Sequence, residues 1–162
     1  MIMGHGDIAS VLIDREDRLY FASGVSNSQE ARESEYSREI DLLLSQSGDK
    51  RLVYFGSLCI FYSDTRYARH KKKMEGLVRN FPLHTIMRLG NITWGANPHT
   101  LMNFLRQEVA QDRPIEIWNT YRYIVDKEEF LHWVNLIPDF NCEMNVTGQP
   151  MKVSEIVKKY VL

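Results

Sequence analysis

The sequence predicts an α/β fold with a largely parallel sheet. Short apolar runs alternate along the chain with stretches whose apolar residues recur at helical spacing, a pattern typical of strands joined by crossover helices. The chain has 162 residues, of which 44% are hydrophobic and 11% aromatic, enough to fill the core of an ordinary domain. We therefore expect residues 1–162 to form a single compact domain.

The first part of the chain predicts a strand, a turn and a second strand. Met1–Met3 is a very short apolar run, and the glycine-containing residues 4–12 predict a turn that opens a helix. Leu19–Ser23 predicts the next strand, because it is apolar and contains two aromatic residues. The polar residues 24–35 then predict a loop.

The middle of the chain continues the alternation of helices and strands. Helical spacing of Ile40, Leu43 and Leu44 predicts a helix, and Ser47–Asp49 breaks it. A third buried strand follows, then a helix that ends before Phe81, a fourth strand and a further helix. The predicted ranges, in order, are Tyr36–Ser45, Leu52–Phe55, a helix from near Tyr67, His84–Leu89 and Pro98–Val109.

Charge and hydropathy exclude several functional classes. The formal net charge is -1, so the chain as a whole does not attract nucleic acid or anionic membranes. No apolar run approaches membrane-spanning length, and no charged segment followed by an apolar one stands at the start. We expect a cytoplasmic protein that binds neither nucleic acid nor membrane.

The cysteines and histidines do not predict a metal site. Cys59 and Cys142 have no metal-ligand spacing, and we expect both to be buried free thiols. The five histidines are separated along the chain and share no ligand spacing either. We therefore expect no bound metal.

Ser57, Tyr67 and Lys71 are the candidate catalytic residues. Ser57 ends an apolar run, and Tyr67 and Lys71 are four residues apart at the mouth of a predicted helix, so that they share one face. An ammonium beside a phenol favours the phenolate and lowers its pKa, and a serine hydroxyl can orient a substrate oxygen. The alternative is an exposed tyrosine on a charged helix whose lysines are solvated.

Motifs along nearly the whole chain resemble an extended short-chain dehydrogenase/reductase of the NAD-dependent epimerase/dehydratase family. The glycine turn at 4–10, the strand and loop at 19–24, the strand that ends at Ser57, and the Tyr67–Lys71 pair are similar to family motifs in the family's order. Three later segments are also similar to family motifs. The first is Met87–Gly95, whose counterpart in the family lies beside the substrate. The second is a strand, an arginine-containing turn and an aspartate-led helix at 115–134, and the third is the closing stretch Asn145–Val161.

The resemblance implies a Rossmann-like, mostly parallel sheet flanked by helices. Residues 1–90 would form a cofactor-binding-like portion and residues 91–162 a small substrate-side portion. The implied cofactor is NAD or NADP, and its candidate contacts are Gly4, Gly6, Ile8, Ala22, Ser23, Gly24, Tyr67 and Lys71. Considered alone, the glycine turn is equally compatible with a plain turn.

The resemblance also implies a reaction and a substrate. Tyr67 would exchange a proton with a substrate hydroxyl while hydride moves to or from the nicotinamide, Lys71 would lower the pKa of Tyr67 and bind the ribose, and Ser57 would orient the oxygen. The substrate would be a nucleotide-linked sugar, with Asn91 and Arg122 as candidates for binding its pyrophosphate. The alternative for Arg122 is a surface cation flanking Asp126.

The departures from the family pattern open a second functional hypothesis. Only residues 11–18 separate the glycine turn from the second strand, where the family has a strand, a helix and a strand that hold the adenosine ribose. We therefore expect a sheet truncated on one side, with its first strand at an exposed edge. The chain is then either an abbreviated oxidoreductase or epimerase, or a catalytically silent binding or assembly module. Because exposed edges are usually paired or covered, we also expect a homo-oligomer. The resemblance implies a dimer through Tyr36–Ser45 and Tyr67–Arg79, since subunits of the family commonly pair through these helices.

Overall fold

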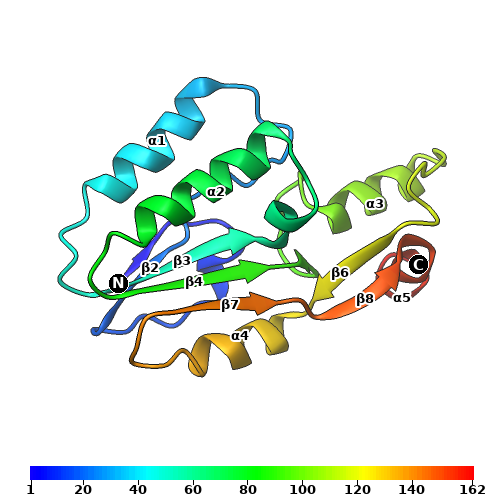
Figure 1. Ribbon diagram of the computed structural model, residues 1–162. Coiled ribbons are helices and arrows are strands. Elements are labelled where there is room, and N and C mark those ends of the chain that lie inside the picture. Colours follow the sequence, from blue (N-terminus) through cyan, green and yellow to red (C-terminus); the bar gives the residue numbers. More distant parts are fainter.

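The computed structural model describes residues 1–162 and has a five-stranded parallel sheet at its centre (Figure 1). The strand order is β1-β2-β3-β4-β7, and every neighbouring pair is parallel. The strands are β1 (Ile2–Met3), β2 (Arg18–Phe21), β3 (Arg51–Ser57), β4 (His84–Leu89) and β7 (Cys142–Val146). This arrangement confirms the predicted α/β fold.

Helices cover both faces of the central sheet. α1 (Glu33–Leu44) and α2 (Arg66–Val78) lie side by side on one face, and α4 (Lys127–Asn135) lies on the other (Figure 1). Alternate residues of the strands point to opposite faces. One core cluster packs under α1 and α2 and contains Leu19, Phe21, Leu43, Leu52, Tyr54, Met74, Val78 and Ile86. The other packs under α4 and contains Tyr20, Val53, Phe55, Met87, Phe130 and Val134, among others.

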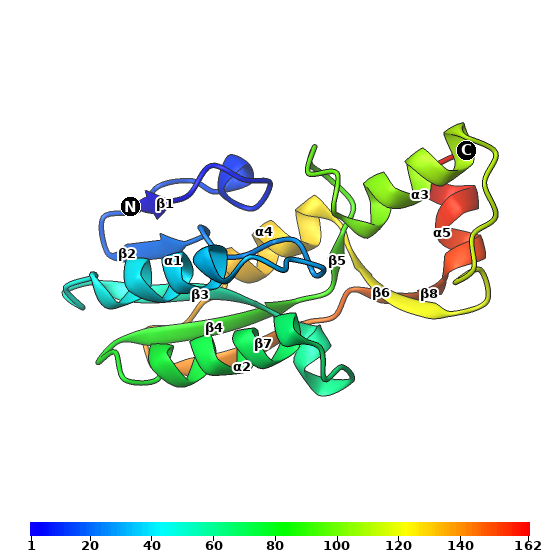
Figure 2. The same ribbon diagram turned by 90° about the horizontal axis from the view of Figure 1, so that it is seen from above.

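A second, three-stranded sheet lies beyond the carboxyl ends of β4 and β7 (Figure 2). Its order is β5-β6-β8, with β5 (Asn91–Ile92), β6 (Tyr121–Val125) and β8 (Gln149–Lys152). α3 (Leu101–Ala110) and α5 (Val153–Tyr160) pack with it around Met102, Leu105, Ile124, Val153, Ile156 and Val157. Because β5 follows β4 and β8 follows β7 along the chain, the two sheets are joined where the central strands end.

The predicted truncation of the sheet is present, and the predicted helix after the glycine turn is wrong. β1 stands at the edge of the sheet and pairs only with β2. The glycine turn leads into a 3₁₀-helix of three residues, Ala9–Val11, after which Leu12 is already extended. The chain must return to Arg18 within the next few residues to begin β2, so it has no length for a crossover helix.

A second expectation also needs correction. The segment 115–134 was expected to supply a strand, then an arginine-containing turn, then a helix. In the structure residues 116–119 form turns, and Arg122 lies inside β6. The helix does begin after an aspartate, because the Asp126 side chain accepts a hydrogen bond from the Glu129 backbone N–H and caps α4.

No helix of the chain has the length and apolarity needed to cross a membrane.

Candidate functional site

Ser57, Tyr67 and Lys71 come together at the carboxyl end of β3. Ser57 is the last residue of β3, and a short 3₁₀-helix, Leu58–Phe61, follows it. Thr65 then caps α2, since its hydroxyl accepts from the Ala68 backbone N–H, and this places Tyr67 and Lys71 on the first turns of the helix. The Lys71 Nζ lies 5.5 Å from the centre of the Tyr67 ring.

The protonation of Tyr67 differs from the sequence-based expectation. Burial raises the pKa of Tyr67 well above its usual value, and neighbouring Cys59 and Glu39 raise it further, while the nearby Ser57 hydroxyl acts in the opposite direction. The expected lowering of this pKa by Lys71 is therefore wrong for this state of the protein. The main physical reason is the burial of the phenol, and in addition the Lys71 ammonium is paired with a carboxylate.

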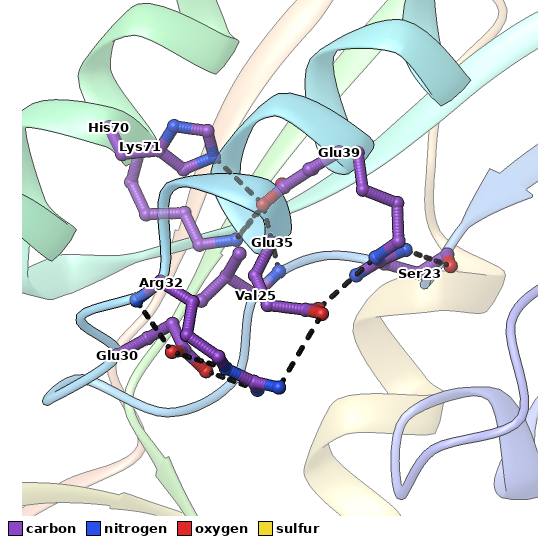
Figure 3. Close-up of polar contacts among 9 residues, drawn as sticks. Ser23, Val25, Glu30, Arg32, Glu35, Glu39, His70 and Lys71 are labelled. Carbon is purple, nitrogen blue, oxygen red and sulfur yellow. Dashed lines mark hydrogen bonds and ion pairs between the residues drawn. The ribbon is translucent and has the colours of Figure 1, made fainter.

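That carboxylate belongs to Glu39 of α1, which the sequence reasoning did not identify (Figure 3). Lys71 Nζ donates to Glu39 Oε1 at 3.1 Å, and the Tyr54 hydroxyl donates to the same oxygen at 2.9 Å. His70 Nε2 lies 2.9 Å from Glu39 Oε2, and the Val25 backbone N–H donates to that oxygen at 2.8 Å. We call Glu39, His70, Lys71, Tyr54 and the Val25 amide the Glu39 cluster.

The Glu39 cluster is buried and charged. Glu39 is 0% exposed and Lys71 3% exposed. Burial alone raises the pKa of Glu39, but the Lys71 ammonium and the hydrogen bonds from His70 and Val25 outweigh it, so that the pKa of Glu39 lies well below its usual value. Glu39 follows Tyr36 and precedes Leu43 on the buried face of α1, so an acidic residue at apolar helical spacing was the available sequence signal.

The loop after β2 lies against the Glu39 cluster. A Cβ atom on Gly24 would lie 2.8 Å from both Glu39 Oε1 and Lys71 Nζ, so a side chain there would displace the ion pair. Arg38 Nη1 donates to the Ser23 carbonyl at 3.1 Å and lies 3.3 Å from the Ser23 hydroxyl (Figure 3). Ser23 and Gly24, two expected cofactor contacts, are thus in contact with α1 and with the paired lysine.

The two glycines of the first turn differ in their surroundings. Gly4 has a φ of +119°, and a Cβ on it would lie 2.3 Å from the Ala22 carbonyl oxygen, so the turns after β1 and β2 touch at this point. Gly6 has open space where its Cβ would stand. Ile8 packs against the core cluster under α4. Of these residues, Gly6 is the one whose backbone remains open to a ligand.

Asp7, beside Gly6, holds the segment Trp94–Asn97 across the turn. Its carboxylate accepts from the backbone N–H groups of Ala96 and Asn97 at 3.0 and 3.1 Å. The Asp7 carbonyl accepts from Trp94 Nε1 at 3.0 Å. Asn97 Nδ2 also donates to the Ser26 hydroxyl at 3.0 Å, so the segment is fixed to the loops after both β1 and β2.

The two candidate pyrophosphate ligands lie in the second sheet. Asn91 Nδ2 donates to the Tyr123 carbonyl at 3.1 Å, and Arg122 Nη1 donates to the Thr120 hydroxyl at 2.9 Å and to the Tyr121 carbonyl at 2.8 Å. Burial raises the pKa of Tyr62, and Cys59 raises it as well, while the Arg122 charge lowers it. Arg122 is therefore close to the loop that follows Ser57.

Neither cysteine belongs to a disulfide or to a group of side chains that could hold a metal ion. Cys59 and Cys142 are free, as expected, but they are half-buried, so the expectation that they are buried is wrong. No group of three or more His, Cys, Asp or Glu side chains is arranged to hold a metal ion.

Comparison with solved structures relates this geometry to known proteins. The Bordetella bronchiseptica enzyme WbmG, crystallised with NAD and also with NAD and UDP, matches 88% of this chain with a TM-score of 0.67 and 15% identity. UDP-galactose 4-epimerase matches 88% of it at 0.63 and 14% identity. The capsular polysaccharide assembling protein CapF of Staphylococcus aureus matches 88% at 0.60 and 15% identity.

The chain spans about half the length of these proteins: the match covers 54% of WbmG, 61% of the epimerase and 43% of CapF. No protein-family model matches the sequence, and no curated protein is similar to it. At such identities the likeness concerns the fold. The chain thus has the Rossmann-like fold of the matched parts of WbmG, the epimerase and CapF.

Proposed function

We propose that this chain is an abbreviated NAD(P)-dependent oxidoreductase or epimerase that acts on a nucleotide-linked sugar. The observation that carries the proposal is the convergence of Ser57, Tyr67 and Lys71 at the carboxyl end of β3. In open α/β sheets, ligands bind outside the carboxyl ends of the strands. The solved structures of the same fold include enzymes crystallised with NAD.

The residues present fit one half of a nicotinamide dinucleotide better than the other. In this proposal Ser57, Tyr67, Lys71 and the loop at Gly24 would hold the nicotinamide and its ribose. Gly6 leaves an open approach for a pyrophosphate. The adenosine half has less support, because the helix after the turn is only three residues long and the carboxylate of Asp7 stands beside the turn. We therefore expect weak binding.

Each catalytic candidate has a role that follows from its chemistry. The Tyr67 hydroxyl would give a proton to, or take one from, a substrate oxygen, and the Ser57 hydroxyl would hold that oxygen in place. Lys71, released from Glu39, would lower the pKa of Tyr67 and bind ribose hydroxyls. A bound nicotinamide supplies or accepts the hydride in chemistry of this kind.

Arg122 and Asn91 on the second sheet support the proposed substrate class. Arg122 lies near the loop after Ser57, and a guanidinium can bind two phosphate oxygens at once. Asn91, on the neighbouring strand β5, could donate to a ligand if its contact with the Tyr123 carbonyl were exchanged. A nucleotide-linked sugar would present its pyrophosphate to these two residues.

Thermal unfolding with and without NAD or NADP tests the proposal. A ligand that binds only the folded chain raises its melting temperature, so we expect a small rise with one of these cofactors at millimolar concentration. ADP-ribose, which lacks the nicotinamide, is the control and should raise it less. If cofactor binds, Tyr67→Phe should abolish turnover while leaving the cofactor-induced rise intact. Turnover by Tyr67→Phe would remove Tyr67 from the mechanism.

A catalytically silent binding or assembly module is the second candidate. It is favoured by the buried Lys71–Glu39 pair and by the segment Trp94–Asn97, which is fixed across the glycine turn. Two surface hollows, one beside Leu19 and Phe81 and the other beside Val109 and Trp118, are lined by residues other than the catalytic candidates. No shift in melting temperature with either cofactor would favour this function over the enzyme.

Self-association is part of both candidates. We propose a dimer, because β1 leaves one edge of the central sheet unpaired. α1 and α2 lie together on one face and would supply the contact (Figure 1). Light scattering coupled to size-exclusion chromatography should give twice the chain mass of 19.0 kDa, and a mass equal to one chain would contradict the dimer.

A further inference from the structure

We propose that Glu39 is a positioning residue that controls the acidity of Tyr67 by holding the Lys71 ammonium in a buried carboxylate clamp. The proposal deepens the function given above and rests on it for its catalytic consequence. Its physical content, an effect of Glu39 on Tyr67 through Lys71, can be measured without any cofactor or substrate.

The clamp uses both oxygens of the carboxylate. Oε1 accepts from Tyr54 and Lys71, and Oε2 accepts from Val25 and faces His70. Lys71 Nζ also reaches Oε2, at 3.4 Å. A carboxylate has about four acceptor sites, so Glu39 is saturated by its neighbours. A saturated carboxylate keeps its negative charge and its position.

Burial strengthens the ion pair between Glu39 and Lys71. The side chains of Glu39, Lys71 and His70 are 0%, 3% and 5% exposed, so water screens their charges poorly. The Glu39 carboxylate therefore cancels much of the Lys71 charge as seen from Tyr67, whose ring centre is 5.5 Å from Nζ.

The remaining charged and titratable neighbours do not replace this effect. On α1, the Tyr36 ring contacts the His70 ring with centres 4.7 Å apart, and the Arg66 guanidinium lies 4.5 Å from the Tyr36 ring centre. On the strand and the 3₁₀-helix, Tyr54 and Cys59 are neutral groups whose pKa burial raises. Lys71 is thus the cation placed to lower the pKa of Tyr67. In this proposal, the Glu39 carboxylate sets how much of that effect is cancelled.

The clamp is also tied to the loop along which a cofactor would lie. The Val25 amide donates to Glu39, and Gly24 leaves just enough room for the ion pair. Arg38, the residue before Glu39, holds the Ser23 carbonyl (Figure 3). A ligand that contacts Ser23–Val25 would therefore act on Glu39 directly, and ribose hydroxyls near Gly24 would compete with Glu39 for Lys71.

The test is a titration of Tyr67 by NMR, with tyrosine labelled at Cζ and the Tyr67 signal assigned by its loss in Tyr67→Phe. In the wild type, we expect Tyr67 to remain protonated to the highest pH at which the chain is folded. Glu39→Gln leaves the Lys71 charge uncancelled, and we expect its Tyr67 pKa to fall by about one unit or more, as is usual for a neighbouring charge. An unchanged Tyr67 pKa in folded Glu39→Gln would overturn the proposal.

Two further variants separate an electrostatic effect from loosened packing. The double variant Glu39→Gln/Lys71→Met has no charge at either position, and Tyr67 should titrate as in the wild type. Glu75→Gln, which neutralises another buried acid on α2, should leave the Tyr67 pKa unchanged. A lowered pKa in either of these variants would mean that loosened packing is responsible and would overturn the proposal. If Glu39→Gln does not fold, Glu39→Asp, whose carboxylate is one methylene further from Lys71, should lower the pKa by a smaller amount.

Cofactor binding completes the test. If NAD or NADP binds, Glu39→Gln should bind it more tightly than the wild type, because Lys71 no longer has an internal partner. Absence of binding in every variant, together with the expected Tyr67 shifts, would reject the proposed enzyme and leave the role of Glu39 standing. Binding by the wild type with no gain in Glu39→Gln would reject competition between Glu39 and the cofactor for Lys71.

Discussion

The Glu39 carboxylate on α1 holds the Lys71 ammonium on α2 at 3.1 Å, although the two residues are 32 positions apart in the sequence. Both side chains are buried, and the pair lies between the loop after β2 and the carboxyl end of β3. This contact joins the two helices at the position where a parallel α/β sheet binds its ligands. We propose above that it also limits the positive charge that acts on Tyr67.

A second buried ion pair predicts a large loss of stability when it is broken. Arg88 of β4 donates to both oxygens of Glu75 of α2, from Nε at 2.8 Å and from Nη2 at 2.7 Å. Arg88→Met would leave the Glu75 carboxylate buried with a weaker partner, Arg79. We expect a loss of about 3–5 kcal/mol in the free energy of unfolding, measured by urea denaturation.

Two matched variants check this interpretation. Arg88→Met/Glu75→Leu removes both charges and should recover most of the lost stability, because an apolar pair can replace a buried ion pair. Arg69→Ala removes the exposed pair with Asp64 and should change the stability little. A double variant as unstable as the single one would show that packing around Arg88, and not the unpaired carboxylate, is responsible.

The lowered pKa of Glu143 predicts that the folded chain loses stability in acid. Hydrogen bonds from Arg79 and Arg88 lower the pKa of Glu143 from 4.5 to about 2, against the opposing effect of burial. A lowered folded-state pKa means that the unfolded chain binds more protons, so this contribution is present above the unfolded pKa and is lost as the pH falls toward about 2.

The measurement for Glu143 compares urea denaturation of the wild type and Glu143→Gln at several pH values. We expect the wild type to be more stable at pH 6 and this advantage to shrink steadily between about pH 5 and pH 2. Glu128→Gln, on α4 and outside this network, should show no such trend. A constant difference between the wild type and Glu143→Gln across the range would contradict the prediction.

Replacement of Gly4 or Gly6 by alanine should affect the melting temperature very differently. Gly4→Ala would place a Cβ 2.3 Å from the Ala22 carbonyl oxygen at a φ of +119°, so we expect a large drop in melting temperature. Gly6→Ala meets no atom within 4 Å, and the chain should keep its melting temperature. If the cofactor pyrophosphate lies at this turn, Gly6→Ala should weaken NAD binding. Undiminished binding would place the cofactor elsewhere.

The contact between Asp7 and the segment Trp94–Asn97 predicts a local effect on backbone dynamics. Asp7→Ala removes the acceptor of the Ala96 and Asn97 amides, so both should exchange with deuterium faster in native-state hydrogen exchange. Amides of β3, which are bonded within the central sheet, should keep their protection. Unchanged exchange at Ala96 and Asn97 would show that other contacts hold the segment in place.

The central sheet was predictable because its strands are short apolar runs separated by clear breaks. His84–Leu89 has the bounds that the sequence predicted, and the helix expected from near Tyr67 begins at Arg66. Burial on both faces of a parallel sheet makes such runs nearly continuous, which is why they stand out. The sequence also indicated the truncation, since too few residues separate the glycine turn from β2 to form a strand, a helix and a strand.

The polar contacts of the site were not predictable in the same way. Helical periodicity places Glu39 on the buried face of α1, but it does not identify a partner on another helix. The pairing depends on how α1 and α2 pack, and the pKa of Tyr67 is raised mainly by burial, which the sequence does not show. The prediction of a helix after the glycine turn was wrong for a similar reason. Local spacing favoured a helix, but the connection to β2 is too short to contain one.

A crystal structure of the chain grown with millimolar NADH tests the account most directly. We predict the nicotinamide ring between Ser57 and Tyr67, with the Lys71 ammonium turned from Glu39 toward the ribose hydroxyls. Crystals without cofactor density, in which Lys71 still donates to Glu39 and Asp7 still holds Ala96 and Asn97, would contradict it.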